Sequence, residues 1–332
     1  MPNSTCTSNF GYFDSPEFLK LSLHLLTAFS TPFYCLGIYC ILFKTPPHMN
    51  PVKWYLLSLH LSITLFDYSI TLFTVSYMLV PELVGIFYGG LRWFNLPNFV
   101  GLIVIFFLCC VVFCTLSMFE HRFFVLCEFR VKKYWGYARK PWLLWHYALL
   151  VGCFVPAFYM MPDQEEAKEI VFERLPCLPQ EIYAESLLIV ALDYKYIGIS
   201  CILGGLGYVF ELAIFVISMI ISGRAQIKSM RMSQKTYQMH KQFFIALVIQ
   251  TAIPSVTLFV PMGYVYMVMV ISYYNQAINN LCIITITFHG WLATVVMLTV
   301  HQPYRLAVVE LFKKQMRRTQ LIPMMSVSGL AA

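Results

Sequence analysis

The sequence predicts an all-α membrane protein: a bundle of seven transmembrane helices, with the N-terminus outside and the C-terminus inside. Of the 332 residues, 59% are hydrophobic and only 12% are charged, whereas soluble domains contain about 45–50% apolar and about 25% charged residues. Apolar runs of the length that crosses a bilayer recur along the chain (about 20 residues). Basic residues gather in every second connection between these runs, and this asymmetry gives the direction of the chain.

The apolar runs define the elements in order. Backbone groups in hydrocarbon must pair within their own segment, so each run is expected to be a helix. The alternating strands of about ten residues that a membrane barrel needs are not found. The expected domains are an extracellular tail at 1–18, a transmembrane domain at 19–300, and a cytoplasmic membrane-surface helix with a short tail at 301–332. The expected spans are roughly 19–43, 54–80, 97–120, 141–161, 196–222, 242–272 and 277–300.

The direction follows from the positive residues, which favour the cytoplasmic side. With the N-terminus outside, the inner segments hold 18 of the 23 Lys and Arg residues, while eight acids lie between Asp163 and Asp193. The sequon at Asn3 agrees, because glycans are added on the lumenal side. The formal net charge of +7 therefore belongs to the inner face, where it can meet anionic lipid, and does not indicate nucleic-acid binding.

Only Cys6 and Cys177 lie clearly on the oxidising side in this topology. Most of the other cysteines stand inside apolar runs, where cysteine behaves as a small hydrophobe. A Cys6–Cys177 disulfide would tie the N-terminal tail over the longest outer loop. Two free thiols are the alternative.

Ionisable residues within the spans are candidates for function, because burying them in a membrane is costly. Asp67 lies near the middle of the second span and His289 near the middle of the seventh. We expect a hydrogen bond between them, direct or through water, that rearranges on activation. A static, satisfied polar pair is the alternative. For Glu211 in the fifth span, Gln250 in the sixth is one plausible partner.

The sixth span contains Pro254 and Pro261. Each proline removes a backbone hydrogen bond and bends the helix, so the inner end can swing while the outer end moves little. A 19-residue basic inner loop joins this span to the fifth. We therefore expect the inner ends of these two helices to be the part that opens.

Glu120 and Arg122 stand two residues apart at the inner end of the third span, after a run from Phe99 to Phe119 without charge. A partly dehydrated ion pair there would hold while the inner ends of the helices are closed, and would exchange partners when they separate. The alternative is that Arg122 simply extends to lipid phosphates, as helix-end arginines do.

Seven helices, an outside N-terminus and an acidic residue closely followed by arginine at the end of the third helix resemble a G-protein-coupled receptor. More specifically, the chain resembles the nematode chemosensory serpentine receptors of class H, from Ser15 to about Arg318. The segments that carry this resemblance are "SPEFLKLSLHLL", "YCILFKTPPHMNPVKWYLLSLH", "MFEHRFF", "PCLP" and "HGWLATVVMLTVHQPYR".

The resemblance implies several properties. A heterotrimeric G protein would bind the basic inner surface, and the receptor would reside in the plasma membrane, in sensory-neuron cilia. "HQPYR" stands where the family pattern Asn-Pro-x-x-Tyr is expected, so Pro303 and Tyr304 join the candidate switch residues. The acid and the arginine are adjacent in rhodopsin-like receptors, whereas His121 separates them here. The candidate G-protein contacts are Arg130, Lys132, Lys133, Arg224, Lys228 and Arg231.

A ligand cavity is expected among the outer halves of the third, fifth, sixth and seventh helices. Phe99, Phe106, Phe259 and Tyr264 lie at suitable depth. No deep carboxylate marks an amine site, so the expected ligand is a small, mostly apolar environmental or pheromone-like molecule. A peptide captured by the acidic loop 163–193 is the alternative.

Other function classes fit less well. A seven-helix ligand-gated channel subunit, the alternative to a receptor, would place the N-terminus inside. His24 and His60 lie about 15 Å apart in depth, too far to share a zinc ion with ligands at about 2.1 Å. With no nucleophile motif, paired-carboxylate site or Gly-rich phosphate loop, the sequence predicts no enzyme, no metal and no cofactor.

Overall fold

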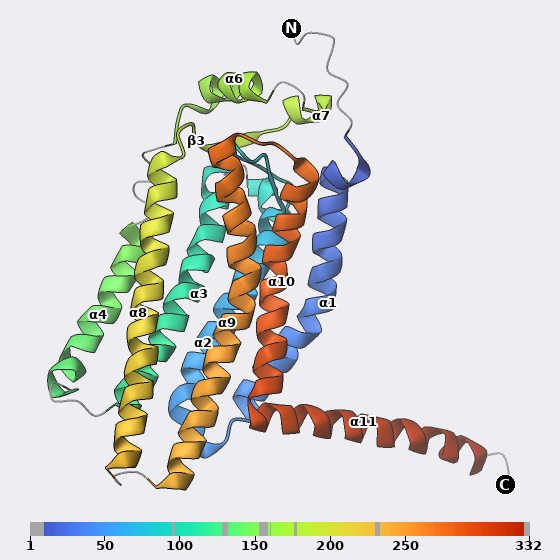
Figure 1. Ribbon diagram of the computed structural model, residues 1–332. Helices are drawn as coiled ribbons and strands as arrows, with labels where there is room; N and C mark the ends of the chain where they lie inside the picture. Colours follow the sequence, from blue (N-terminus) through green and yellow to red (C-terminus); the bar gives the residue numbers. More distant parts are fainter. Residues whose placement is uncertain are drawn as a thin grey trace.

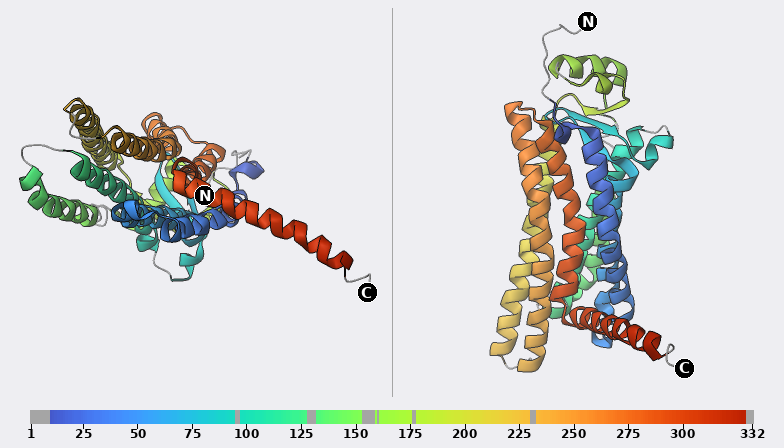
Figure 2. Two further views of the ribbon diagram at one scale, coloured as in Figure 1. Left: turned by 90° about the horizontal axis from the view of Figure 1, so that it is seen from below. Right: turned by 90° about the vertical axis from the view of Figure 1, so that its right-hand side faces the viewer.

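The computed structural model describes residues 10–94, 97–127, 132–152, 159, 161–175, 178–229 and 233–328. The chain forms a bundle of long helices with a small sheet across one end, and one further helix projects sideways from the other end (Figures 1 and 2). We call the end that carries the sheet the cap end, and the end that carries the projecting helix the tail end.

Six helices among the described residues are long and apolar enough to cross a membrane. They confirm the helical prediction for six of the expected spans. In the second span the α-helix runs on into a π-helical turn, Ser69–Thr74. The six are α1 (Pro16–Phe43), α2 (Asn50–Tyr68, with its π turn), α3 (Pro97–Leu126), α8 (Lys195–Lys228), α9 (Gln234–Ile271) and α10 (Gln276–Val300).

The helix α4 (Lys132–Gly152) corresponds to the span expected at 141–161. It begins at Lys132, so its first turns carry the basic residues that were expected to form a loop. The apolar continuation at 153–158 lies outside the described residues. The connection between α8 and α9 is likewise shorter than expected, since both helices extend into the predicted loop at 223–241.

Polar side chains begin three of the long helices. Ser15, Ser233 and Asn275 each accept a hydrogen bond from a backbone N–H three residues further on. This contact satisfies one of the amides that a helix start leaves unpaired. The sequence therefore fixes these starts locally, before any tertiary packing.

The cap end contains strands that were not expected. The predicted second span continued to residue 80, but the helix ends at Thr74, because Val75 adopts a left-handed backbone (φ 44°) and the chain turns into a strand. Three antiparallel strands follow in the order β1-β2-β3, with Tyr77 opposite Ile86 and Ile86 opposite Leu187. They are β1 (Ser76–Met78), β2 (Leu83–Phe87) and β3 (Leu187–Ala191).

Two short helices, α6 (Gln164–Arg174) and α7 (Gln180–Tyr183), lie over this sheet (Figure 1). Together the strands and short helices enclose an apolar cluster of their own, which includes Tyr77, Val171 and Ile182 and also takes in Leu19 and Leu23 of α1. A second, larger cluster fills the bundle between α2, α3, α9 and α10.

The last helix, α11 (Gln302–Ser328), runs across the tail end rather than along the bundle (Figure 2). The apolar side chains of Leu306, Val309 and Phe312 on this helix are exposed. An exposed apolar face on a basic helix is typical of helices that lie on a membrane surface.

Candidate functional site

Three consecutive residues at the tail end of α3 contact three different helices. Glu120 contacts α4, His121 contacts α2 and Arg122 contacts α9. Successive helix residues point about 100° apart, because a turn has 3.6 residues. A helix in the centre of a bundle can therefore connect to three neighbours through one short segment.

Glu120 is fully buried and satisfied by α4. Its carboxylate accepts hydrogen bonds from the Trp135 indole N–H (2.9 Å) and from Arg139 Nη2 (2.8 Å). The Arg139 guanidinium also lies over the Phe124 ring, 4.3 Å from its centroid. A buried carboxylate with a charged donor and a neutral donor is a stable arrangement, so this pair joins α3 and α4 firmly.

Arg122 does not pair with Glu120, and the expected ion pair between them is not formed. Residues at i and i+2 of a helix do not face each other, and α4 already occupies the carboxylate. Arg122 is instead 8% exposed and lies over the Phe243 ring of α9, 3.5 Å from its centroid. Its Nε has no hydrogen-bond partner among the described residues. The contact is a cation–π interaction between α3 and α9.

His121 stacks on Tyr55 of α2, with the ring centroids 4.5 Å apart and the planes within 18°. Neither ring nitrogen has a hydrogen-bond partner in the described part of the chain. The residue that interrupts the expected acid–arginine motif therefore forms a third contact of the same segment.

Next to Phe243, His301 joins the end of α10 to α9. Its Nε2 lies 2.9 Å from Gln250 Oε1, and its ring centroid is 5.3 Å from that of Phe243. Burial, together with the nearby Arg122 charge, lowers the pKa of His301 to about 4, so the imidazole is neutral at pH 7 and Nε2–H donates to Gln250. The expected Gln250–Glu211 contact is not formed, since Glu211 Oε2 lies 3.1 Å from His146 Nε2.

Asp67 and His289 are both buried, as expected, but they do not bond directly. Asp67 Oδ2 accepts a short hydrogen bond (2.6 Å) from the Tyr34 hydroxyl of α1. Asp67 Oδ1 and His289 Nδ1 have no partner among the described residues. Tyr34, rather than His289, is the partner of Asp67 because Gly290 leaves room for the Tyr34 hydroxyl. A Cβ at position 290 would collide with that hydroxyl.

The remaining switch candidates occupy buried positions. The Tyr304 side chain is fully buried, and its hydroxyl lies 2.9 Å from Oγ1 of Thr45, which follows the tail end of α1. Pro303 lies at the start of α11, directly after the end of α10. Pro254 and Pro261 lie on the buried side of α9, which continues through both without interruption.

The predicted ligand residues do not form one site. Phe259 is 56% exposed and Phe106 is 41% exposed, so Phe259 faces the surroundings of the bundle. Tyr264 packs beside the β1–β2 turn, in a small cluster with Val80 and Val268. The Phe99 side chain lies outside the described residues.

The cap is connected to the bundle by polar side chains of α10. Asn280 donates to the Phe13 carbonyl (2.9 Å), Asn279 to the Val80 carbonyl (2.9 Å) and Gln276 to the Met78 carbonyl (3.2 Å). These bonds attach the turn before α1 and the start of the sheet to the same helix. The cap is therefore an integral part of the bundle.

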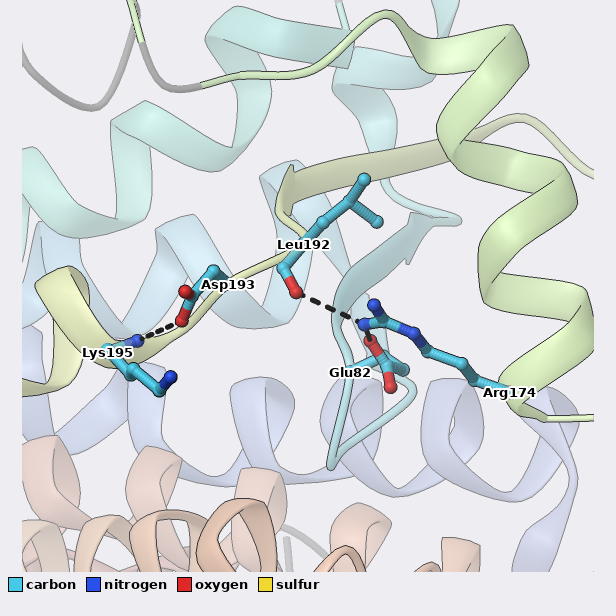
Figure 3. Close-up of polar contacts among 5 residues, drawn as sticks. All are labelled: Glu82, Arg174, Leu192, Asp193 and Lys195. Atoms are coloured by element: carbon cyan, nitrogen blue, oxygen red, sulfur yellow. Dashed lines mark hydrogen bonds and ion pairs between the residues drawn. The ribbon is translucent and has the colours of Figure 1, made fainter.

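Arg174, at the end of α6, joins the upper layer of the cap to the sheet (Figure 3). Its Nη1 donates to Glu82 Oε2 in the β1–β2 turn (3.1 Å) and to the Leu192 carbonyl after β3 (3.1 Å). Beside it, Asp193 accepts from the Lys195 backbone N–H (2.9 Å) at the first residue of α8. One arginine thus connects three parts of the cap.

A family model described as "Serpentine type 7TM GPCR chemoreceptor Srh" matches residues 14–314. The chain belongs to this family. Srh proteins are seven-transmembrane receptors of the G-protein-coupled type, so the family accounts for the spans, while ligands and G proteins are partners of such receptors in general.

Two relatives of this Srh chain agree with the assignment. "Serpentine receptor class H-72" of Caenorhabditis elegans is 26% identical over 325 residues, covering 97% of this chain and 93% of that protein. "Serpentine receptor class r-10" of Caenorhabditis briggsae is 24% identical over 213 residues, covering 58% of this chain and 60% of that protein. The resemblance identified from the sequence motifs is confirmed.

Several predicted positions of the Srh chain stay untested. Cys6, Cys177, Asn3, Arg130 and Arg231 lie outside the described residues. The first turns of α4 and the last turns of α8 carry the other candidate G-protein contacts, of which Lys133, Arg224 and Lys228 are exposed and Lys132 is half-buried. No group of His, Cys, Asp or Glu that could hold a metal ion occurs among the described residues.

Sequence reasoning missed the partners of the segment around Arg122 in this Srh receptor. Phe243, Trp135 and Arg139 are ordinary residues in their own helices, and no local motif marks them. The one available signal was spacing: with three polar residues in a row at a helix end, at most one can face any given neighbour. That argument leads to three partner helices, but not to their identity.

Proposed function

We propose that this protein is a chemosensory receptor of the plasma membrane that binds a small, mostly apolar molecule and activates a heterotrimeric G protein. The observation that carries the proposal is the position of Arg122. It is a buried cation at the tail end of the central helix, and an aromatic ring on α9 holds it instead of a carboxylate. Such a contact can be broken by a modest movement of α9.

The cap end is the extracellular end in this proposal, and the tail end is cytoplasmic. Most of the Lys and Arg residues fall in segments at the tail end, as the positive-inside rule requires. The exposed apolar face of α11 then lies on the inner leaflet, with Lys313 and Lys314 near lipid phosphates. The sequon at Asn3 lies on the side where glycans are added.

Activation follows as a shift between two states. In the closed state Arg122 lies on Phe243, which holds α9 against α3. When the tail ends of α8 and α9 move away, Arg122 becomes available, and the basic ends of α4 and α8 line the opening. A ligand favours the open state only by the difference between its affinities for the two states.

The α3–α4 contact is expected to stay in place while α8 and α9 move. Glu120 is satisfied by Arg139 and Trp135, and breaking a buried pair is costly. The α3–α9 contact involves no ion pair among the described residues. The weaker contact is therefore the one expected to open.

A ligand screen tests the proposal. Cells that express the receptor with a promiscuous G-protein α-subunit and a calcium reporter are exposed to a panel of small apolar compounds. We expect a response that a G-protein inhibitor abolishes and that an Arg122→Ala variant with equal surface expression lacks. A ligand-evoked current that persists under the inhibitor would instead indicate a channel subunit, and a response only to basic peptides would favour the acidic surface of α6.

Membrane topology is tested separately. An Asn3→Gln variant should migrate faster than the wild type on a gel, because it lacks one glycan. An epitope after Ala332 should bind antibody only in permeabilised cells. Antibody binding to intact cells would reverse the proposed orientation.

A further inference from the structure

The first turns of α4 have an inner side and an outward side. On the inner side, Trp135 and Arg139 donate to Glu120 of α3. Lys132 lies on the same side, with its Nζ 5.5 Å from the centroid of the Phe124 ring of α3. These contacts fix the rotation of α4 about its own axis, so its opposite side faces away from α3.

The outward side of α4 carries four exposed residues in one stripe: Lys133, Tyr137, Lys140 and Leu144. Their spacing of four, three and four residues places them within about 60° of one another around the helix. Tyr137 is 72% exposed and Leu144 is 69% exposed, so no element in the described part of the chain covers this outward stripe. The helix itself lies at the edge of the bundle (Figures 1 and 2).

The outward stripe crosses the boundary between water and hydrocarbon at the tail end. The apolar run that is expected to span the membrane begins at residue 141, so both lysines precede it and Leu144 lies within it. Lys133 and Lys140 are about 10 Å apart along the helix axis, with Tyr137 between them. Tyrosine is enriched at the level of lipid headgroups, and lysine at that level is attracted to anionic lipid.

The two lysines of the outward stripe have no acidic neighbour in their own part of the chain. Residues 129–162 contain no Asp or Glu, and Glu120 is bound by Arg139 on the inner side of the helix. Cations without a counter-charge at this surface complement the anionic lipids of the inner leaflet. A lipid reaches the outward side by diffusion within the membrane, whereas a G protein in an opening beside α3 would meet the inner side.

We propose that the outward stripe of α4 binds an anionic phospholipid of the inner leaflet. Lys133 and Lys140 pair with headgroup phosphates, Tyr137 lies beside the headgroup, and the acyl chains run along Leu144. Because the two cations are separate, a headgroup with more than one phosphate, as in a phosphoinositide, fits better than phosphatidylserine. The proposal goes beyond the receptor function and takes from it only the orientation, with the tail end in the cytoplasm.

The test uses the full-length receptor in phosphatidylcholine nanodiscs with a phosphatidylinositol bisphosphate that carries a photoreactive diazirine on its headgroup. After illumination, mass spectrometry locates the labelled residues, while unlabelled phosphatidylinositol bisphosphate competes over a range of concentrations. The matched variants are Lys133→Ala and Lys132→Ala, which remove the same charge from adjacent residues, one on the outward side and one on the inner side. Equal thermal stability of the two variants shows that both are folded.

We expect labelling at Tyr137 that the unlabelled lipid displaces. The half-saturating concentration of that competitor should rise about fivefold in Lys133→Ala and about 25-fold when Lys140→Ala is added. It should change less than twofold in Lys132→Ala and in Lys133→Arg, which keeps the charge. Phosphatidylserine should compete at least fivefold less well than phosphatidylinositol bisphosphate.

Equal values in Lys133→Ala and Lys132→Ala would overturn the proposal, because they would show attraction to the net charge of the tail end only. Equal competition by soluble inositol trisphosphate would overturn the lipid as the ligand, and equal competition by phosphatidylserine would overturn the phosphoinositide. Loss of Tyr137 labelling on addition of a nucleotide-free G protein would assign the stripe to that partner instead. The nanodiscs hold the probe in both leaflets, so this experiment tests the stripe alone, and the epitope after Ala332 tests the orientation.

Discussion

The replacement of Phe243 by leucine tests the role of the Arg122 contact. The substitution removes the aromatic ring but keeps an apolar side chain of similar reach. The Arg122 guanidinium lies 3.5 Å from the ring centroid and is 8% exposed, so the contact belongs near the desolvated end of the cation–π range, about 2 kcal/mol. That free energy changes the closed–open equilibrium roughly 30-fold. A receptor that is open about 1% of the time without ligand would become open about a quarter of the time.

The assay is basal G-protein activation, measured as nucleotide exchange in membranes and normalised to the amount of receptor at the surface. Phe244→Leu is the matched control, since Phe244 is the next residue, is also half-buried and packs against the same core. Phe243→Trp should retain low basal activity, because tryptophan is the best ring for this contact. Equal basal activity in Phe243→Leu and Phe244→Leu would refute the assignment of Phe243 as the closed-state partner of Arg122.

Three further predictions concern other contacts. Glu120→Gln should lower the unfolding free energy by about 3 kcal/mol, because it leaves the Arg139 guanidinium partly buried without its carboxylate. A thermal melt measures this loss. In the control variant Arg92→Gln, which breaks an exposed ion pair, the loss should be less than about 1 kcal/mol. Between about pH 6.5 and pH 4 the unfolded state binds a proton at His301 that the folded state does not, so His301 should make stability fall with falling pH, by about 1.4 kcal/mol per pH unit. The pH slope of stability should be less steep by this amount in His301→Asn, and an identical slope in that variant would exclude His301 as a source. Asn280→Ala should speed hydrogen exchange in residues 10–15, because it releases the Phe13 carbonyl, and unchanged exchange would show that apolar packing alone holds this turn.

The spans could be predicted because their signal is composition. A run such as Phe99 to Phe119 contains no charge and can satisfy its backbone in hydrocarbon only as a helix. The predicted ends of the helices were less accurate. Polar residues continue a helix beyond the apolar run, as in the first turns of α4 and the last turns of α8. The cap was missed because residues 75–80 continue the apolar run of the second span, and only the left-handed backbone at Val75 ends the helix there.

The sequence indicated where polar residues are buried, but not which residues they contact. Depth alone placed Asp67 near His289, yet the Tyr34 hydroxyl at 2.6 Å is the partner. The burial of Glu120 and Arg122 could be predicted from their place at the end of an apolar run. Their partners on α4 and α9 could not, because these depend on how those helices are rotated about their own axes. Rotation about the helix axis is set by tertiary packing, and a run of uniformly apolar residues carries little information about it.

The most direct test of the account is the distance between the tail ends of α3 and α9. Spin labels introduced as non-canonical amino acids at Val125 and Lys241, both exposed, avoid the 11 cysteines of the chain. Pulsed electron paramagnetic resonance should show one short-distance population in the wild type and in Phe244→Leu, and an added longer-distance population in Phe243→Leu. Identical distance distributions in all three proteins would contradict the account, because Arg122 and Phe243 would then not hold α3 and α9 together.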